Sequence, residues 1–307
     1  AERGKPGALC PGSPADINIW RKSPGHGADQ RHREKNMNRA FLSVAALAAL
    51  GFASTPAFAQ CDKGEVVIKF SHVVAASGNP KGEAAQKLAA RINSEMNGKA
   101  CMEVYPNSQL FDDDKVLEAM LLGDVQLAAP SLSKFEKYTK KFRVFDLPFM
   151  FSSMAAVDKF TGSPAGQKLL HSMDKVGFVG LGYWNNGLKQ FSAKKPLMTP
   201  ADAKGLKFRV QPSDVAVAMI GAMGASAQKM AFKEVYGALQ TGVVDGQENS
   251  WSNIYSMKFF EVQDGVTETN HQLLNYLLVT SKSWLDGLKP DVRTQFLKIL
   301  DEVTTEA

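Results

Sequence analysis

The chain lacks the motifs that mark the common catalytic folds. Its 307 residues contain no Walker A loop, no HExxH zinc motif, no GxSxG elbow and no GxGxxG sequence that opens a helix. Histidine is scarce: beyond residue 60 only His72, His171 and His271 occur, and they lie far apart in the sequence. We therefore predict that the protein is not an enzyme and holds neither a cofactor nor a metal.

Basic charge is missing from most of the chain. The formal net charge is +5, but eight of the 36 Lys and Arg residues and four of the 31 Asp and Glu residues lie in residues 1–59. The remainder carries 28 basic and 27 acidic residues, so no basic surface calls for a nucleic-acid partner. A hydrophobic fraction of 44% and a charged fraction of 22% are typical of a soluble globular protein long enough for two domains.

The N-terminal region carries the signs of export. Met37 and Arg39 precede an apolar run at residues 40–53, and Ala57 and Ala59 provide the small residues of a cleavage site. This predicts a signal peptide at residues 37–59, too short for a membrane span, and a periplasmic protein. Residues 1–36 show no apolar periodicity and are interpreted as an upstream extension that is either non-native or the result of a mis-called start.

Cysteine is rare, with three residues in the chain. Cys61 and Cys101 remain after the predicted cleavage, and a pair in an exported protein predicts a disulfide that closes a loop of about 40 residues. Two unpaired thiols are the alternative. Lipidation of Cys61 is disfavoured by Gln60, and a metal site is disfavoured because no second CxxC or HxxxH accompanies the pair.

The apolar pattern predicts an α/β protein. Residues 66–70 and 101–105 are typical of strands, and residues 83–96 between them repeat apolar side chains at helical spacing. This order predicts parallel strands joined by a right-handed crossover. Further strands are predicted at residues 125–129, 177–183, 188–193, 206–210, 265–267 and 277–280, and further helices at 153–160, 165–173, 214–223, 233–240, 255–260 and 290–303.

Residues 242–254 concentrate glycines, acids and side-chain amides. Gly242 is expected to end the preceding helix, Val243 and Val244 predict a short buried strand, and Gly246 predicts a sharp turn. Polar groups at the carboxyl end of a strand are where α/β proteins bind their ligands. An ordinary loop is the alternative.

The strand predicted at residues 206–210 presents two cations on one face. Alternation places Lys207 and Arg209 opposite Phe208, and the planar fork of arginine can hold a carboxylate through two hydrogen bonds. This favours an anion-binding cleft. A solvated strand face is the alternative.

Three more polar residues occupy comparable positions. Lys81 precedes a predicted helix whose N-terminal amides favour anions. Lys189 and Ser192 follow a break in the pattern at residues 184–187. A loop lysine and a solvated strand are the respective alternatives.

An ordered set of short motifs resembles the extracytoplasmic solute receptors of TRAP transporters, the DctP-like family. The matching segments are residues 71–74 with 80–82, then 104–110, 146–149, 183–187, 204–210 and 238–249. Order and spacing agree from about residue 66 to the end of the chain. So many ordered motifs make the resemblance specific.

The resemblance implies an α/β, two-domain periplasmic binding protein fold with a cleft between the domains and hinge-connected strands. Domain I is expected at residues 60–185 plus 275–307 and domain II at residues 186–274. The hinges are expected near residues 184–187 and 271–276. The family continues with a long helix past the equivalent of Ala307, so we expect the C-terminus to be truncated.

The resemblance also implies the function. The protein is expected to close on a C4-dicarboxylate (malate, succinate or fumarate) and to present it, as a monomer, to the integral membrane subunits of a TRAP transporter. The alternatives are another organic anion, such as a 2-oxo acid or a sugar acid, a sensor component or an exported enzyme.

The family's ligand contacts map onto named residues here. Arg209 is implied to grip a carboxylate and Asn249 to be a further contact. Lys81, Lys189 and Tyr276 are similar to the remaining contacts of the C4-dicarboxylate branch, and Ser192 and Trp184 complete the predicted set. Lys194 stands where this branch commonly has Asn, and an extra cation near the cleft is expected to shift ligand preference.

Overall fold

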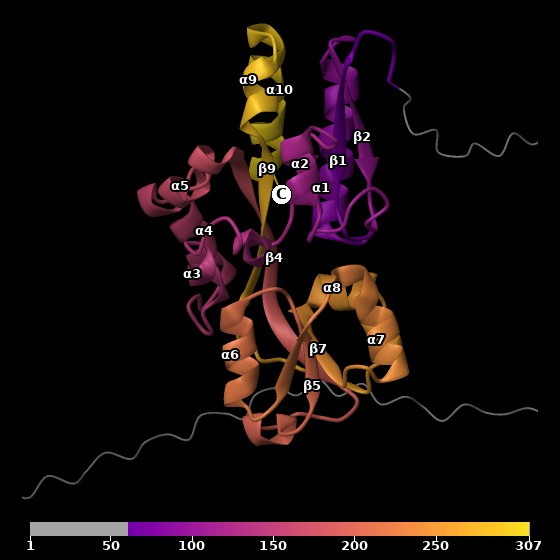
Figure 1. Cartoon of the computed structure of the whole chain (residues 1–307), viewed down its shortest axis with the longest axis vertical. Coiled ribbons are helices and arrows are strands. Elements are labelled where there is room, and N and C mark those ends of the chain that lie inside the picture. Colours follow the sequence, from indigo (N-terminus) through magenta and orange to yellow (C-terminus); the bar gives the residue numbers. More distant parts are fainter. Residues whose placement is uncertain (1–60, 307) are drawn as a thin grey trace, which may run out of the picture.

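A computed structural model describes residues 61–306 as an α/β protein with two lobes (Figure 1). Within these residues the strands form one sheet in the order β2-β1-β3-β9-β4-β7-β5-β6, and β8 pairs with β4. The predicted fold class is confirmed. The predicted signal peptide at 37–59 and the extension at 1–36 lie outside the described residues.

The first lobe is built on the predicted strand–helix–strand unit. Strand β1 (Val66–Ser71) pairs in parallel with β2 (Ala100–Tyr105), and helix α1 (Pro80–Glu95) connects them. Helix α1 buries Leu88 and Ile92 in a core that it shares with the C-terminal helix α10 (Pro290–Glu306). These elements confirm the predicted strand–helix–strand unit. The apolar spacing within each element and the turn residues at its ends both indicated the same boundaries.

The other face of this lobe is covered by short helices and an aromatic cluster. These helices are α2 (Val116–Leu122), η1 (Leu132–Phe135), α3 (Arg143–Asp146), α4 (Met154–Thr161), α5 (Pro164–Leu170) and η2 (Asp174–Val176). Strand β3 (Leu127–Ala128) belongs to the sheet, and α9 (Lys282–Gly287) joins the core of α1 and α10 through Leu285. Phe142 and Phe145 are buried in the cluster, whereas Phe149 is 72% exposed.

Two long antiparallel strands join the lobes. Strand β4 (Phe178–Ala193) pairs with β9 (Leu273–Ser281) over most of its length, and both run through the middle of Figure 1. The prediction of two strands separated by a break at residues 184–187 was wrong. The register instead shifts between Asn185 and Gly187, which is a bulge that bends a strand without ending its pairing.

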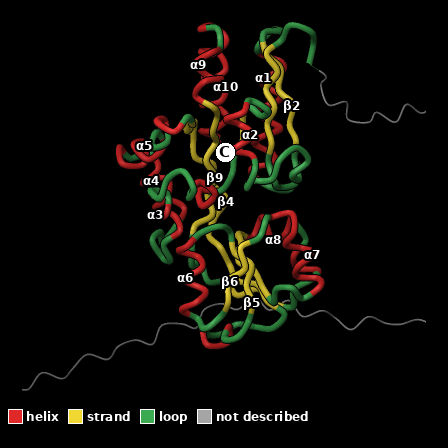
Figure 2. Tube along the Cα trace, viewed as in Figure 1, coloured by secondary structure: helices red, strands yellow, loops and turns green. Residues whose placement is uncertain are grey.

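The second lobe places helices on both faces of its part of the sheet (Figure 2). Its elements are η3 (Pro200–Ala203), β5 (Lys207–Val210), α6 (Asp214–Ala222), β6 (Ser226–Lys229), η4 (Phe232–Glu234), α7 (Val235–Thr241), β7 (Gly246–Ser250), α8 (Trp251–Ser256), η5 (Phe259–Glu261) and β8 (Gly265–Thr267). Helix α6 packs on β4 and β5 through Ile220 and Phe208, and α7 and α8 cover the other face.

The segment at residues 242–254 differs from its prediction. Gly242 ends α7 in the left-handed conformation (φ 76°), as expected. Val243 is 57% exposed, however, and the strand is the polar Gly246–Ser250, which is buried throughout. The first residue of this strand is glycine because a Cβ at Gly246 would lie 2.4 Å from the Ser192 carbonyl oxygen. Apolar content therefore misplaced the strand.

The predicted disulfide is present. Cys61 and Cys101 are bonded, with their Cα atoms 5.5 Å apart, which ties the start of the described chain to β2. The alternative of two free thiols is excluded. None of the helices in residues 61–306 combines the length and the hydropathy that a membrane span requires.

Candidate functional site

All seven residues predicted to bind ligand are buried. None is more than 2% exposed, and they come from both lobes: Lys81, Trp184, Lys189, Ser192, Arg209, Asn249 and Tyr276. A solvated strand or loop, the alternative for four of them, is therefore excluded. What distinguishes the seven is whether their polar atoms already have partners.

Lys81 lies in the first turn of α1, and its side chain reaches the residue after β3 and one residue of β9. Its Nζ donates to the carbonyl oxygen of Ala129 at 3.0 Å and lies 3.7 Å from the centre of the Tyr276 ring. Burial lowers the pKa of Lys81 from 10.5 to about 8, and the nearby carboxylate of Asp113 opposes this shift. The ammonium has hydrogen-bonding capacity left for an anion.

Arg209 lies on β5 and is held on one side only. Its Nε and Nη2 donate to the carbonyl oxygen of Met230 at 3.1 and 2.9 Å, and its guanidinium lies 5.7 Å from the centre of the Phe232 ring. Its Nη1 is buried and has no hydrogen-bond partner in the described part of the chain. Buried donors are rarely left unsatisfied, so this atom is suited to an acceptor from a ligand.

Lys189 forms a buried ion pair with Glu248. The Nζ–Oε2 distance is 2.8 Å, and the same Nζ donates to Gln272 Oε1 at 2.6 Å. His271 stacks on Phe191 and places Nε2 3.9 Å from the Glu248 carboxylate. Lys189 thus already has a buried countercharge in Glu248, and its predicted contact with a ligand stays a prediction.

Burial controls the protonation of this group. It raises the pKa of Glu248, and the charges of Lys189 and Arg209 oppose the shift. It lowers the pKa of His271 to about 3, with a smaller contribution from Lys189. The imidazole is therefore neutral near pH 7 and the buried cation is Lys189.

Side-chain amides form a chain of hydrogen bonds that crosses between the lobes. Asn79 donates to Asn253 Oδ1 (2.9 Å), Asn253 to Asn249 Oδ1 (2.8 Å), and Asn249 to Gln247 Oε1 (3.0 Å). Gln247 continues to the hydroxyl of Ser192 at 2.8 Å. The strand register places Ser192, Gln247 and Arg209 on one face of the sheet, so this chain lies beside the guanidinium.

Sequence reasoning missed three members of this chain, namely Asn79, Gln247 and Asn253. The signal for two of them was the density of amides at residues 242–254. Asn79 caps α1 by accepting from the Lys81 N–H at 3.2 Å, and its position just before Pro80 is typical of a cap. Capping predicted a local role for Asn79 but not its bond to the other lobe.

Trp184 is part of the core of the first lobe, and its predicted contact with a ligand stays a prediction. It lies opposite Tyr276 in the β4–β9 register, and its indole N–H donates to Thr304 at 3.2 Å. Since its one side-chain donor is already engaged, a ligand would meet only its ring. Tyr276 does take part in the polar site, since its hydroxyl accepts from Asn186 (3.0 Å) and Asn253 (3.2 Å).

The expected effect of Lys194 on the cleft is also not supported by its position. The side chain is exposed, and a Cβ built on Gly242 would lie 3.4 Å from its Nζ. The ammonium therefore lies at the C-terminal end of α7, where a cation is favourable. It is absent from the polar chain and from the surroundings of Arg209.

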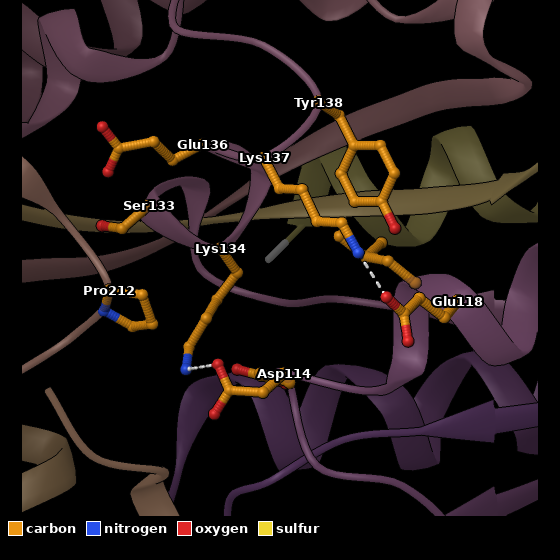
Figure 3. Close-up of a pocket in the computed structure, with 10 residues that line it drawn as sticks. Asp114, Glu118, Ser133, Lys134, Glu136, Lys137, Tyr138 and Pro212 are labelled. Carbon is orange, nitrogen blue, oxygen red and sulfur yellow. Dashed lines mark hydrogen bonds and ion pairs between the residues drawn. The ribbon is translucent and has the colours of Figure 1, made fainter.

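A separate pocket of about 200 Å³ opens where the lobes meet (Figure 3). Figure 3 shows two of its ion pairs, Lys134 with Asp114 (2.6 Å) and Lys137 with Glu118. Pro212 is its lining residue from the second lobe. None of the seven predicted residues lines it, so the pocket borders the buried site without containing it.

Comparison with known proteins identifies the family. Residues 70–307 match the model of the bacterial extracellular solute-binding proteins, family 7. The C4-dicarboxylate-binding periplasmic protein DctP of Vibrio cholerae is 63% identical over 265 residues, which is 86% of this chain and 80% of that protein.

Two solved structures are also similar. A TRAP periplasmic solute-binding protein of Shewanella oneidensis with bound succinate is 53% identical, with a TM-score of 0.77, and the match covers 78% of this chain and 79% of that one. A second, from Pseudomonas aeruginosa with bound L-malate, is 47% identical, with a TM-score of 0.76 and coverage of 78% and 84%.

The buried Lys189–Glu248 pair generates a prediction about stability. Lys189→Met leaves the Glu248 carboxylate without its countercharge and is expected to lower the free energy of unfolding by roughly 3–5 kcal/mol. The double variant Lys189→Met/Glu248→Gln is expected to recover a large part of this loss. Denaturant unfolding without ligand measures both changes.

The exposed pair of Lys137 and Glu118 provides the matched control, since Lys137→Met removes an ion pair that water screens and is expected to have little effect. Equal losses in the single and double Lys189 variants would contradict the role of Glu248 as its compensating charge.

Proposed function

The chain belongs to the bacterial extracellular solute-binding proteins, family 7, and on that premise we propose that it captures a C4-dicarboxylate (malate, succinate or fumarate). The proposed ligand lies between the two lobes, in contact with Arg209 and Lys81. Support comes from the relative in Vibrio cholerae and from the solved structures that hold succinate and L-malate.

The observation that carries the proposal is the buried, unpartnered Nη1 of Arg209. A carboxylate is a suitable acceptor, because it meets a guanidinium with matched geometry and opposite charge. The second carboxylate of a diacid would then meet Lys81, which comes from the other lobe. Each charge of the ligand gains a cationic partner, which offsets the loss of its hydration.

The other predicted residues are proposed to act in two ways. Asn249 retains one N–H donor for a ligand oxygen. The Tyr276 hydroxyl donates to Asn253 Oδ1 over a long 3.5 Å, and we propose that it turns to donate to the ligand instead. One N–H donor of Lys189 is engaged by Gln272 and its charge is paired with Glu248, so we propose at most a secondary contact of Lys189 with the ligand. Ser192 orders Gln247, and through it Asn249.

We propose that the lobes act as domains that close on the ligand. Domain I comprises residues 60–185 and 275–307, and domain II residues 186–274, with the boundaries where β4 and β9 pass between them. The Asn79–Asn253 bond and an ion pair between Lys233 and Asp112 (3.2 Å) join the two. A closed monomer in the periplasm would then deliver its ligand to the membrane subunits of a TRAP transporter.

We propose a receptor and not an enzyme. The family is one of solute-binding proteins. Burial lowers the pKa of both His72 and His271 to about 3, so that neither is suited to general base chemistry near pH 7. No cofactor or metal enters the proposal.

The proposal is tested by calorimetry against a ligand panel. Succinate, L-malate and fumarate are expected to bind, and butyrate, which keeps the chain but lacks the second carboxylate, is expected to bind at least about 100-fold more weakly. Binding of a sugar acid or a 2-oxo acid with no response to any C4-diacid would favour the alternative ligand class. Turnover of a bound acid would favour an enzyme.

The role of Arg209 predicts a large effect of its removal. Arg209→Ala is expected to weaken diacid binding by at least about 2 kcal/mol, because a desolvated charge loses its partner. Lys207→Ala is the matched control, since Lys207 lies on the same strand but is exposed. Affinity unchanged in Arg209→Ala would remove Arg209 from the site.

The lowered pKa of Lys81 predicts a pH dependence. As pH rises through about 8, Lys81 of the free protein loses its charge, so affinity for a dianion is expected to fall by up to tenfold per pH unit. Stability changes in the opposite direction: between about pH 8 and 10.5 the unfolded chain holds this proton more tightly, so the Lys81 contribution to the free energy of unfolding rises.

Calorimetry from pH 7 to 9.5 measures the binding effect. In Lys81→Gln the affinity is expected to be low at pH 7 and without the fall near pH 8. A flat profile in the unmodified protein would show that Lys81 does not face the ligand charge.

A further inference from the structure

One buried carboxylate, that of Asp146 at the end of α3, is shared by both lobes. Its Oδ1 accepts a hydrogen bond from the hydroxyl of Ser133 in the first lobe at 2.8 Å. Its Oδ2 accepts one from the hydroxyl of Ser213 in the second lobe, also at 2.8 Å. Asp146 is 3% exposed and Ser213 is 1% exposed, so water does not compete for either bond.

Ser213 also caps the helix that follows it. Its Oγ accepts from the Ala216 N–H at 3.2 Å, and α6 begins at the next residue, Asp214. Asp146 therefore holds the start of α6 through the hydroxyl that caps it. A charged acceptor makes this a stronger hydrogen bond than one between neutral groups.

The segment that contains Ser213 also carries the proposed ligand contact. Arg209 is on β5, and the chain continues directly through Gln211 to Ser213. Gln211 Oε1 accepts from the hydroxyl of Ser131 in the first lobe at 2.6 Å. A short stretch of the second lobe therefore meets the ligand at one end and the first lobe at the other.

Asp146 is connected to Lys189 as well. Its backbone oxygen accepts from the side-chain amide of Gln272, whose Oε1 accepts from the Lys189 ammonium. Burial raises the pKa of Asp146, and the charge of Lys189 and the two serine hydroxyls oppose the shift. The carboxylate thus lies between the two elements that carry Arg209 and Lys189.

A second, exposed contact joins the same segments. Arg143 Nη2 donates to Asp214 Oδ2 at 2.5 Å, and Glu136 Oε2 accepts from the Asp214 N–H at 3.1 Å. The Asp214 side chain is 62% exposed, so this ion pair is screened by water. The buried bond of Asp146 to Ser213 is therefore the more durable of the two.

We infer that Asp146 is a positioning residue for ligand retention: through its hydrogen bond to Ser213 it keeps the two lobes together around the ligand without touching it. The inference rests on the proposed function, because it assumes a ligand held between the lobes. Separation of the lobes breaks the bond, so its loss acts mainly on the rate of ligand dissociation.

Stopped-flow measurement of succinate binding tests the inference. Ser213→Ala and Asp146→Asn are each expected to raise the dissociation rate by roughly 10- to 100-fold, the range for a lost hydrogen bond to a charged acceptor. The association rate is expected to change less than about threefold. The double variant is expected to match the more severe single variant, since Ser213→Ala removes the donor of one contact and Asp146→Asn removes the charge of its acceptor.

Two further variants separate this role from a structural one. Ser153→Ala removes a cap serine from α4, whose Oγ accepts from the Ala156 N–H at 3.2 Å, and is expected to leave the dissociation rate unchanged. Ser213→Thr keeps the hydroxyl and is expected to restore slow dissociation. Equal dissociation rates in Ser213→Ala and Ser153→Ala, or a change confined to association, would overturn the inference.

If the unmodified protein binds no diacid, the proposed function is wrong, and the inference about Asp146 needs a separate test. The Asp146 contact is then measured by hydrogen exchange of the first amides of α6 and of α4. Ser213→Ala is expected to accelerate exchange in α6 more than Ser153→Ala does in α4, because Asp146 also holds Ser213. Equal acceleration would overturn the inference on its own.

Discussion

The structure depends on how charges are compensated once they are removed from water. Arg209, Lys81 and Lys189 are each about 1% exposed, and an isolated buried charge costs several kcal/mol. Lys189 is neutralised by Glu248, whereas Lys81 and Arg209 are met mainly by backbone oxygens and aromatic rings. The last two therefore retain the capacity to attract an anion, and this asymmetry defines the site.

The sequence predicted the fold well where local signals agree with one another. The βαβ unit, the disulfide of Cys61 and Cys101, and the helix end at Gly242 each depend on short-range patterns or on few possible partners. The prediction failed at β7, because Gly246–Ser250 is buried although its side chains are polar; Gln247 is hydrogen-bonded to Ser192 and Glu248 is paired with Lys189. Apolar content cannot identify a strand whose burial depends on hydrogen bonds from elsewhere in the chain.

The sequence allowed candidate site residues to be selected, but it did not show which groups each of them contacts in the folded structure. Alternation along β5 singled out Arg209 and the predicted helix start singled out Lys81, and the motif resemblance added Asn249 and Tyr276. The partner of Lys189 is distant in the sequence, so its compensation by Glu248 appears only in the folded structure. Trp184 is the opposite case. It is close in the sequence to the predicted site residues, but in the folded structure it lies in the core of the first lobe, where its indole N–H donates to Thr304.

The paired strands β4 and β9 have a mechanical consequence. Within residues 61–306, β4 and β9 both pass between the lobes, and the two passages are hydrogen-bonded to each other through a shared register that includes the bulge near Gly187. Such a two-stranded ribbon bends out of the plane of the sheet more easily than its strands slide along each other, because sliding would break many hydrogen bonds at once. Relative motion of the lobes is thereby reduced towards a single rotation. Each time the lobes close, the opposing walls of the site would then meet in the same alignment. Closure would therefore cost little orientational entropy.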